Sequence, residues 1–286
     1  MPQPSEPSSP PPASPRELAA LDLEAYLRDP LRKQAFVTPM FEHIAPRYDT
    51  FTRLFSLGMD ARWKEALMDW FAERTPTRAE ILDVACGTGD LALRAAALRP
   101  AASVLGIDAA EGMVARARAR VGAGDRTRVR FETGDLTRLP LPDASIDVVL
   151  GGYALRNVPQ YEAALVELHR VLRPGGILLT LDFYRPPSAA WRALFLGYLQ
   201  LSGSVVGWWW HRAPVIYAYI AHSIRHYVSA AEFERALERT GFDTTARREH
   251  LLGGIALHAA VRRSAPSRSS EARHQHGTRR TVPRPG

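Results

Sequence analysis

The sequence has almost no cysteine. Cys86 is the single cysteine among 286 residues, which excludes an internal disulfide and a cysteine-based metal site. It lies in a glycine-rich segment, where a small side chain suits close backbone packing, and no base nearby in the sequence favours a catalytic thiol. His222 and His226 have the i, i+4 spacing that can bind zinc. Because the sequence offers no third ligand, we predict no metal.

A long uninterrupted apolar run is also missing. The most apolar stretch, residues 191–210, is broken by Arg192, Gln200 and several glycines and serines, so it is a poor candidate for a membrane-spanning helix. The segment 208–212, Trp-Trp-Trp-His-Arg, suits peripheral contact with a membrane interface. An aromatic lid packed over a sheet explains it equally well, and the two interpretations are compatible. The N-terminus lacks the regions of a signal peptide, which predicts a cytoplasmic protein.

The globular part of the chain has little net charge. Residues 262–286 contain seven arginines and one glutamate, so of the total charge of +7 only +1 remains for residues 1–261. We therefore predict no nucleic-acid partner. Residues 1–15, with seven prolines, and residues 264–286 are predicted to be disordered tails around one domain at 16–263. A non-enzymatic binding protein that uses the arginine tail is one alternative.

From residue 80 to 183, short apolar runs alternate with helix-like stretches, as βαβ units require. The pattern predicts an α/β fold, Rossmann-like and doubly wound, with a mostly parallel seven-stranded sheet. N-terminal helices are predicted within 16–75, and a helical lid insertion on the substrate side at 186–228. Expected strands are 81–84, 103–108, 129–133, 146–151, 177–183, 244–248 and 255–261. Expected helices are 91–98, 111–121, 161–172 and 230–240, with a turn at 173–176.

The segment from Asp83 to Asp90 contains the glycine loop of a nucleotide-binding turn. Gly87, Gly89 and Ala92 fit G-x-G-x-x-A, so a nicotinamide dehydrogenase must be weighed. A carboxylate about 4 Å from a phosphate costs roughly 4 kcal/mol at an effective dielectric near 20. The N-terminus of a helix stabilises a nearby anion such as a phosphate by only about 0.3 to 1 kcal/mol. The two flanking aspartates thus favour a phosphate-free cofactor with an ammonium and a sulfonium, namely S-adenosylmethionine.

Two further acidic residues follow the next strands. Asp108 ends the second predicted strand and can accept hydrogen bonds from both ribose hydroxyls. Asp135 follows the third and can accept one from an exocyclic amine such as that of adenine, while the Leu136 amide donates to the ring. A helix-cap or turn role is the alternative for each aspartate. Three carboxylates at three successive strand ends favour a nucleoside site.

Motifs along most of the chain resemble a known family. They lie at 41–49 (Phe-x-x-Ile-Ala-x-x-Tyr-Asp), 56–64, 82–90, 139–143, 155–158 (Leu-Arg-Asn-Val), 172–176 and 217–224. From about Phe41 to Val261 the chain is similar to class I methyltransferases. The resemblance is closest to the quinone-biosynthesis C-methyltransferases that act on demethylmenaquinol or on a 2-polyprenyl-6-methoxy-1,4-benzoquinol. It implies S-adenosylmethionine as cofactor and a polyprenyl quinol as substrate, with a homodimer as one compatible oligomeric state.

The glycine-loop argument and the resemblance together give the predicted site. The cofactor-binding residues are Asp83, Gly87, Thr88, Gly89, Asp108, Asp135, Leu136 and Gly152. The catalytic candidates are Arg156, Tyr48 and Asp49. Since a guanidinium stays protonated, Arg156 is expected to orient a phenolate rather than act as a base. A structural anchor is its alternative, as a helix start is for Asp49.

Three positions depart from the residues usual in this family, namely Thr52, Gly152 and His222. They affect the identity of the substrate more than the type of reaction. A methyltransferase for another small phenolic or lipophilic acceptor therefore stays open as the main alternative.

Overall fold

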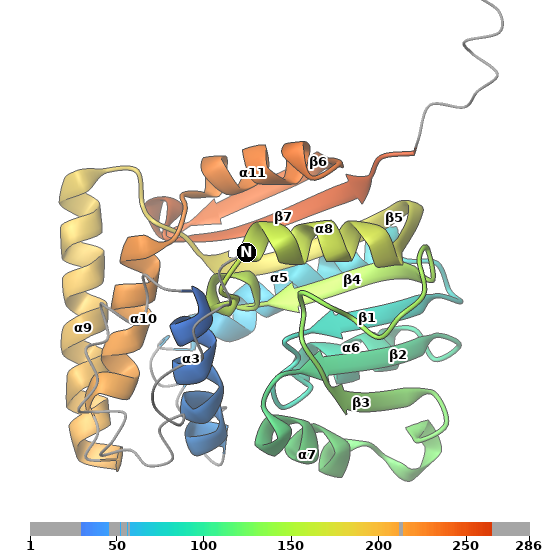
Figure 1. Ribbon diagram of the computed structural model, residues 1–286, viewed down its shortest axis with the longest axis horizontal. Coiled ribbons are helices and arrows are strands. Elements are labelled where there is room, and N and C mark those ends of the chain that lie inside the picture. The colour runs from blue at the N-terminus through green and yellow to red at the C-terminus, as the bar shows by residue number, and fades with distance from the viewer. Residues whose placement is uncertain (1–29, 46–51, 53–55, 57, 212–213, 265–286) are drawn as a thin grey trace, which may run out of the picture.

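The computed structural model describes residues 30–45, 52, 56, 58–211 and 214–264. The predicted catalytic residues Tyr48 and Asp49 lie outside these residues, as do both predicted tails. The side chains of the aromatic segment at 208–210 are also outside the description. Within the described residues, one sheet organises the chain (Figure 1).

The sheet has seven strands in the order β3-β2-β1-β4-β5-β7-β6. Only the two pairings that β7 makes are antiparallel. The strands are β1 (Glu80–Val84), β2 (Ser103–Asp108), β3 (Val129–Thr133), β4 (Ile146–Gly152), β5 (Leu172–Phe183), β6 (Phe242–His250) and β7 (Ile255–Arg262). The predicted Rossmann-like fold with a mostly parallel seven-stranded sheet is confirmed.

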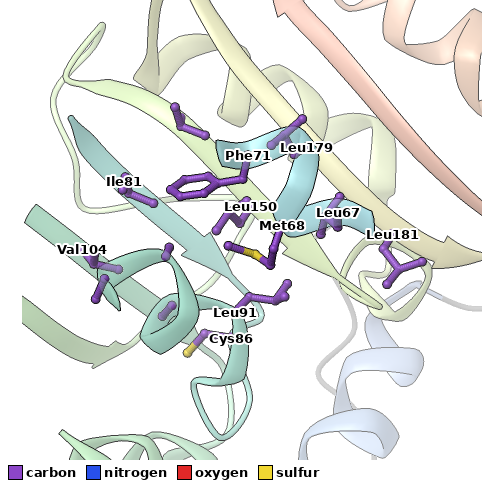
Figure 2. Close-up of a cluster of buried hydrophobic side chains, with 14 of the residues drawn as sticks. Leu67, Met68, Phe71, Ile81, Cys86, Leu91, Val104, Leu150, Leu179 and Leu181 are labelled. Carbon is purple, nitrogen blue, oxygen red and sulfur yellow. The ribbon is translucent and has the colours of Figure 1, made fainter. Parts of the chain in front are cut away.

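Helices cover both faces of the sheet. On one face lie α5 (Met59–Arg74), α6 (Asp90–Leu98) and α7 (Glu111–Arg120), and on the other α8 (Tyr161–Val171) and α11 (Ala230–Arg239). In Figure 2, Leu67 and Phe71 of α5 pack among Ile81, Leu150 and Leu179 from three neighbouring strands. Each such fully buried side chain contributes about 1.5 to 3 kcal/mol. This packing fixes the strands whose ends carry the site.

A third group of helices stands beyond the carboxyl ends of β1 and β4 (Figure 1). It consists of α3 (Pro30–Ile44), α9 (Ala189–His211) and α10 (Pro214–His226), which share a hydrophobic cluster. Phe36 of α3 lies 5.7 Å from Tyr219 of α10, between ring centroids. The predicted helices before the sheet and in the 186–228 insertion are therefore present. That the insertion acts as a lid stays a prediction.

The fifth strand differs from its predicted start. β5 begins at Leu172, directly after α8, whereas the sequence predicted a turn at 173–176 and a strand from 177. Leu172 pairs with Ile146, and the next pairing joins Ile177 to Val148. The Arg-Pro-Gly-Gly segment therefore bulges out of the ladder, with Gly175 at φ +79°. The chain turns here, as predicted, but without leaving the sheet.

Gly106 in β2 provides a test of this packing. A Cβ atom there would lie 2.4 Å from Phe131 Cδ1 and 3.0 Å from the buried Cys86 Sγ. We expect Gly106→Ala to lower the free energy of unfolding by about 1 to 3 kcal/mol, as overpacking does. Thermal and urea unfolding measure this. Gly124→Ala is the matched control, because no described atom lies within 4 Å of its added Cβ, and an equal loss in both variants would contradict the packing argument.

Candidate functional site

A cavity among the described residues lies at a topological switch point. β1 is flanked by β2 on one side and β4 on the other, so the loops after β1 and β4 leave in different directions and open a crevice at their carboxyl ends. The crevice holds about 740 Å³ of empty space, part of it open to solvent. Loops after β1, β2, β3 and β4 line it, and α3 covers it.

The loop after β1 follows a backbone path that few residues adopt. Ala85, Gly87 and Gly89 have φ values of +48°, +54° and +82°. Gly87 lines the cavity, and no described atom lies within 4 Å of a Cβ added there. A side chain at Gly87 would thus occupy the space left for a ligand. The glycine is required both by the left-handed conformation and by the close approach of a bound molecule.

The Asp108 carboxylate joins two of the loops. Its Oδ2 accepts a hydrogen bond from the Gly87 N–H at 2.8 Å, and its Oδ1 accepts one from the Ala110 N–H at 2.9 Å. Burial raises the pKa of Asp108, and these backbone N–H groups oppose the rise. An ionised carboxylate has about four acceptor sites, so the backbone N–H groups leave acceptor capacity for a ligand in the cavity that this side chain lines.

The cavity's charge fits S-adenosylmethionine. Asp108 and Asp135 both line it, and no lysine, arginine or histidine is among the described lining residues. Such a wall favours a cationic ligand and disfavours a phosphate. Carboxylate oxygens are suited to ribose hydroxyls and an exocyclic amine, and the apolar Leu136 and Ile107 are suited to an adenine ring.

The charges beside the glycine loop differ from the sequence-based argument. Asp83 is fully buried and accepts a hydrogen bond from the Ala92 N–H at 3.0 Å. Burial raises its pKa to about 8, so it is mostly neutral at pH 7. Asp90 lies 3.0 Å from Lys64 Nζ and 3.1 Å from Arg94 Nε. The assumption that both aspartates present free charge to a ligand does not fit this geometry, because Asp83 is buried with a raised pKa, Asp90 is paired, and neither is among the lining residues of the cavity.

The structure separates the predicted cofactor residues into two groups. Five line the cavity, namely Gly87, Asp108, Asp135, Leu136 and Gly152, whereas Asp83, Thr88 and Gly89 are not among the lining residues. Thr88 instead contacts Arg120, which donates hydrogen bonds to the Thr88 carbonyl oxygen at 2.8 Å and to its hydroxyl oxygen at 3.1 Å. Contact of each of the eight with the cofactor stays a prediction.

Several lining residues were not predicted. Gln34, Val37, Thr38 and Phe41 project from α3 into the cavity wall, and Tyr153 does so from the end of β4. The spacing of the four α3 residues is that of one helix face, so this signal was present in the sequence. Nothing local in the sequence marks Tyr153, whose φ is +59°.

Arg156 is buried beside the cavity and is not among the described residues that line it. Its Nε lies 3.4 Å from Asp182 Oδ1, its backbone N–H donates to Asp182 Oδ2 at 3.0 Å, and its guanidinium donates to the Ser223 hydroxyl. It also lies over the ring of Phe183, 5.6 Å from the centroid. This geometry favours the structural-anchor alternative, and the catalytic role of Arg156 stays a prediction.

Two polar side chains, Lys33 and Glu42, hold the helix α3 over the cavity through three hydrogen bonds. Near its start, Lys33 Nζ donates to the carbonyls of Arg156 and Val158 at 2.8 and 2.9 Å. Burial, with the neighbouring Arg156 charge, lowers the pKa of Lys33 to about 8. Near its end, Glu42 Oε2 accepts from the Gly112 N–H at 2.8 Å. The helix is thereby tied to the segment that follows β4 and to the first turn of α7.

Residues 30–262 match the family model described as the ubiE/COQ5 methyltransferase family. The chain belongs to this family. Demethylmenaquinone methyltransferase of Thermus thermophilus is 39% identical over 76% of this chain and 96% of its own length. Its counterpart from Deinococcus radiodurans is 37% identical over 77% of this chain and 89% of its own length. This member of the ubiE/COQ5 family is thus an enzyme, an S-adenosylmethionine-dependent methyltransferase, as predicted.

Solved structures agree on the fold. A methyltransferase from Thermotoga maritima matches with a TM-score of 0.54 at 18% identity, covering 79% of this ubiE/COQ5 family member and 100% of that chain. The YcgJ protein of Bacillus subtilis matches with a TM-score of 0.53 at 18% identity, covering 70% and 100%. Within the described part of the chain, no helix is long and apolar enough to cross a bilayer. The same residues contain no cluster of three or more metal-binding side chains.

The raised pKa of Asp83 predicts how stability depends on pH. Folded protein keeps a proton that the unfolded chain releases between its ordinary pKa of 3.8 and about 8. The free energy of unfolding should therefore fall as pH rises through this window. In Asp83→Asn, which keeps an acceptor for Ala92 N–H, the fall should be smaller. Urea titrations of both proteins at pH 5 and pH 8 test this, and equal slopes would rule it out.

The anchor interpretation of Arg156 predicts a loss of stability. Arg156→Ala leaves the Asp182 carboxylate buried without its partner, which costs about 3 to 5 kcal/mol. Arg156→Ala combined with Asp182→Ala should recover part of that loss, measured as the urea midpoint. If Arg156→Ala unfolds at the same midpoint as the unmodified protein, the anchor interpretation is wrong.

Proposed function

We propose that this enzyme C-methylates the ring of a polyprenyl quinol, converting demethylmenaquinol to menaquinol. The observation that carries the proposal is the 39% and 37% identity to two proteins named demethylmenaquinone methyltransferase, across most of their lengths. The benzoquinol step of ubiquinone synthesis is the closest variant of this proposal. Another small phenolic or lipophilic acceptor is the second candidate, supported by the departures at Thr52, Gly152 and His222.

The wall of the cavity suits such an acceptor. The lining includes four apolar side chains, namely Val37 and Phe41 of α3, Met113 of α7 and Val158 after η3 (Leu155–Asn157). Aromatic and aliphatic side chains at these positions match a naphthol ring and the first units of its isoprenoid chain. The lining therefore combines carboxylates with apolar side chains, as a reaction between a charged nucleoside and a lipid requires.

Bound S-adenosylmethionine supplies a methyl group on a sulfonium for in-line displacement. The residues of this chain then have three tasks. Asp108 accepts hydrogen bonds from the ribose hydroxyls of the cofactor, and Asp135 accepts one from its adenine amine. Helix α3 excludes water from the reacting atoms. The apolar side chains of the cavity align the ring carbon with the methyl group. Tyr48 and Asp49 stay candidates for direct roles at the substrate, in the segment that joins α3 to α5.

The direct experiment is turnover by the purified enzyme with a short-chain demethylmenaquinol kept reduced. Mass spectrometry should show a product heavier by one methylene, formed together with S-adenosylhomocysteine. The matching benzoquinol and a simple catechol are run in parallel. Methylation of the catechol alone would support the second candidate instead.

A lipid substrate also suits peripheral contact with a membrane from the cytoplasmic side. Leu194, Tyr198 and Leu201 are 64%, 45% and 69% exposed, and their spacing places them on one face of α9. The exposed described residues from Ala189 to Leu201 include no charged side chain. An exposed apolar face of this kind marks an interaction surface. We propose that it meets the lipid surface, and a homodimer interface is the competing use.

We expect Leu194→Glu with Leu201→Glu to reduce flotation with anionic phosphatidylglycerol vesicles several-fold, because both changes charge the exposed α9 face. The paired control is Val166→Glu with Leu252→Glu, two residues 57% and 70% exposed on other elements. Equal flotation of the two double variants would contradict the membrane proposal. Light scattering in the absence of vesicles reports whether the same changes dissociate a dimer.

A further inference from the structure

A second pocket is lined by residues of α9, of α10 and of the segment that follows β5. The two helices stand side by side beyond the sheet (Figure 1). The pocket holds about 890 Å³ of empty space, part of it open to solvent, and shares no described lining residue with the crevice after β1 and β4. Three arginines line it, namely Arg185, Arg192 and Arg225, and none of its described lining residues is acidic. This arginine pocket is therefore suited to an anion.

Neighbouring carboxylates do not fully cancel the charge of these arginines. Arg185 is paired with Glu232 of α11 at 2.9 Å. Arg192 donates a hydrogen bond to the Pro186 carbonyl at 3.2 Å, and Arg225 is exposed. Within the described part of the chain, neither of these two guanidiniums has a carboxylate partner. Three positive charges and the one negative charge of Glu232 leave a net charge of +2 at the pocket, which a bound anion would compensate.

Negative charge is missing from the whole sequence segment that forms the pocket. Residues 183–231 contain four arginines and no aspartate, glutamate or lysine. The chain has 30 acidic residues among 286, a share that would place about five in these 49 residues. A surface that meets only water usually mixes charges of both signs. A segment without acidic residues is suited instead to contact with a negatively charged surface.

The arginine pocket borders the exposed apolar face of α9. Each residue of that face directly follows a residue of the pocket: Leu194 follows Ala193, Tyr198 follows Gly197, and Leu201 follows Gln200. Successive residues of a helix lie about 100° apart around its axis, so the pocket and the apolar face are neighbours on α9. A free phosphate would use only the guanidiniums, whereas the phosphate of a lipid brings acyl chains that also use the apolar face.

We propose that the arginine pocket binds the phosphate group of an anionic phospholipid while the exposed face of α9 contacts its acyl chains; this rests on the proposed membrane contact. A guanidinium presents two parallel N–H donors to phosphate oxygens. Arg192 and Arg225 supply such donors from two helices, and Arg185 adds a third positive charge. Because α9 and α10 share a hydrophobic cluster with α3, the lipid is bound by the same group of helices that covers the crevice.

The test measures binding of the full chain to vesicles of phosphatidylcholine with and without phosphatidylglycerol. Arg192→Gln with Arg225→Gln should weaken binding to the phosphatidylglycerol vesicles about tenfold or more, since each basic residue near an anionic membrane contributes about fivefold. Arg126→Gln with Arg130→Gln is the matched control, because these exposed arginines at the β3 edge of the sheet remove the same charge. The control should change binding less than about threefold, since charges distant from the membrane are screened. Equal losses in the two pairs overturn the inference.

A second variant tests the pocket without removing an arginine. Ala193→Glu introduces a carboxylate among the guanidiniums and should weaken binding to a similar extent, and it stays informative where the arginine pair fails to fold. Ala123→Glu, at an exposed position of η2 (Ala123–Asp125), adds the same charge next to β3 and should have little effect. Urea unfolding midpoints show which variants are folded. Full binding by a folded Ala193→Glu overturns the inference.

Soluble ligands separate the two sources of a phosphate group. Calorimetry with inorganic phosphate and with glycerol phosphate should show weaker binding than the vesicles do per accessible lipid, because neither ligand contacts the apolar face. Inorganic phosphate that binds as tightly would assign the pocket to a free anion and overturn the lipid assignment. If Leu194→Glu with Leu201→Glu loses vesicle binding while both pocket variants keep it, the membrane contact stands and this inference fails. Turnover of the soluble short-chain quinol tests the proposed methylation independently of all vesicle results.

Discussion

The site depends on the Asp108 carboxylate and the backbone N–H groups that surround it. In the parallel register, Val84 of β1 pairs with Ile107 of β2, so Asp108 lies one step beyond the end of β1. There its two oxygens reach Gly87 in one loop and Ala110 in the next. Burial of this carboxylate costs free energy, and the two N–H donors offset it. Sheet register, loop conformation and the polar wall of the cavity are thereby linked.

Strands that form from a short apolar run between turn-forming residues were predictable from the sequence. β2 and β3 match their predicted bounds to the residue, because short apolar runs between turn-forming residues leave little choice of boundary. The start of β5 was not predictable, since the bulge after Leu172 comes from pairing with β4 rather than from the Arg-Pro-Gly-Gly segment itself. Pairing between distant segments has no signature in a local window.

The candidate site also contains residues that could be placed from the sequence and residues that could not. Asp108 and Asp135 could be placed because parallel strands end at one edge of a sheet. The partners of Arg156 could not, since Asp182 and Ser223 lie 26 and 67 positions away. Charge was the least predictable property. Asp83 and Asp90 looked equivalent in the sequence, yet burial neutralises one and Lys64 pairs with the other. The cavity still favours a cationic ligand, but Asp108 and Asp135 provide the negative charge in place of Asp83 and Asp90.

The position of β7 has a consequence for how the molecule is made. This strand is the last one among the described residues, yet it lies inside the sheet between β5 and β6. During synthesis on the ribosome, β5 therefore keeps an unpaired edge until the residues after Gly254 have emerged. β6 is complete earlier but has no strand to join, because β7 is its neighbour. Until β7 joins, the open edge of β5 and the unpaired β6 are therefore exposed together, the kind of exposed strand edge that makes folding intermediates prone to aggregation.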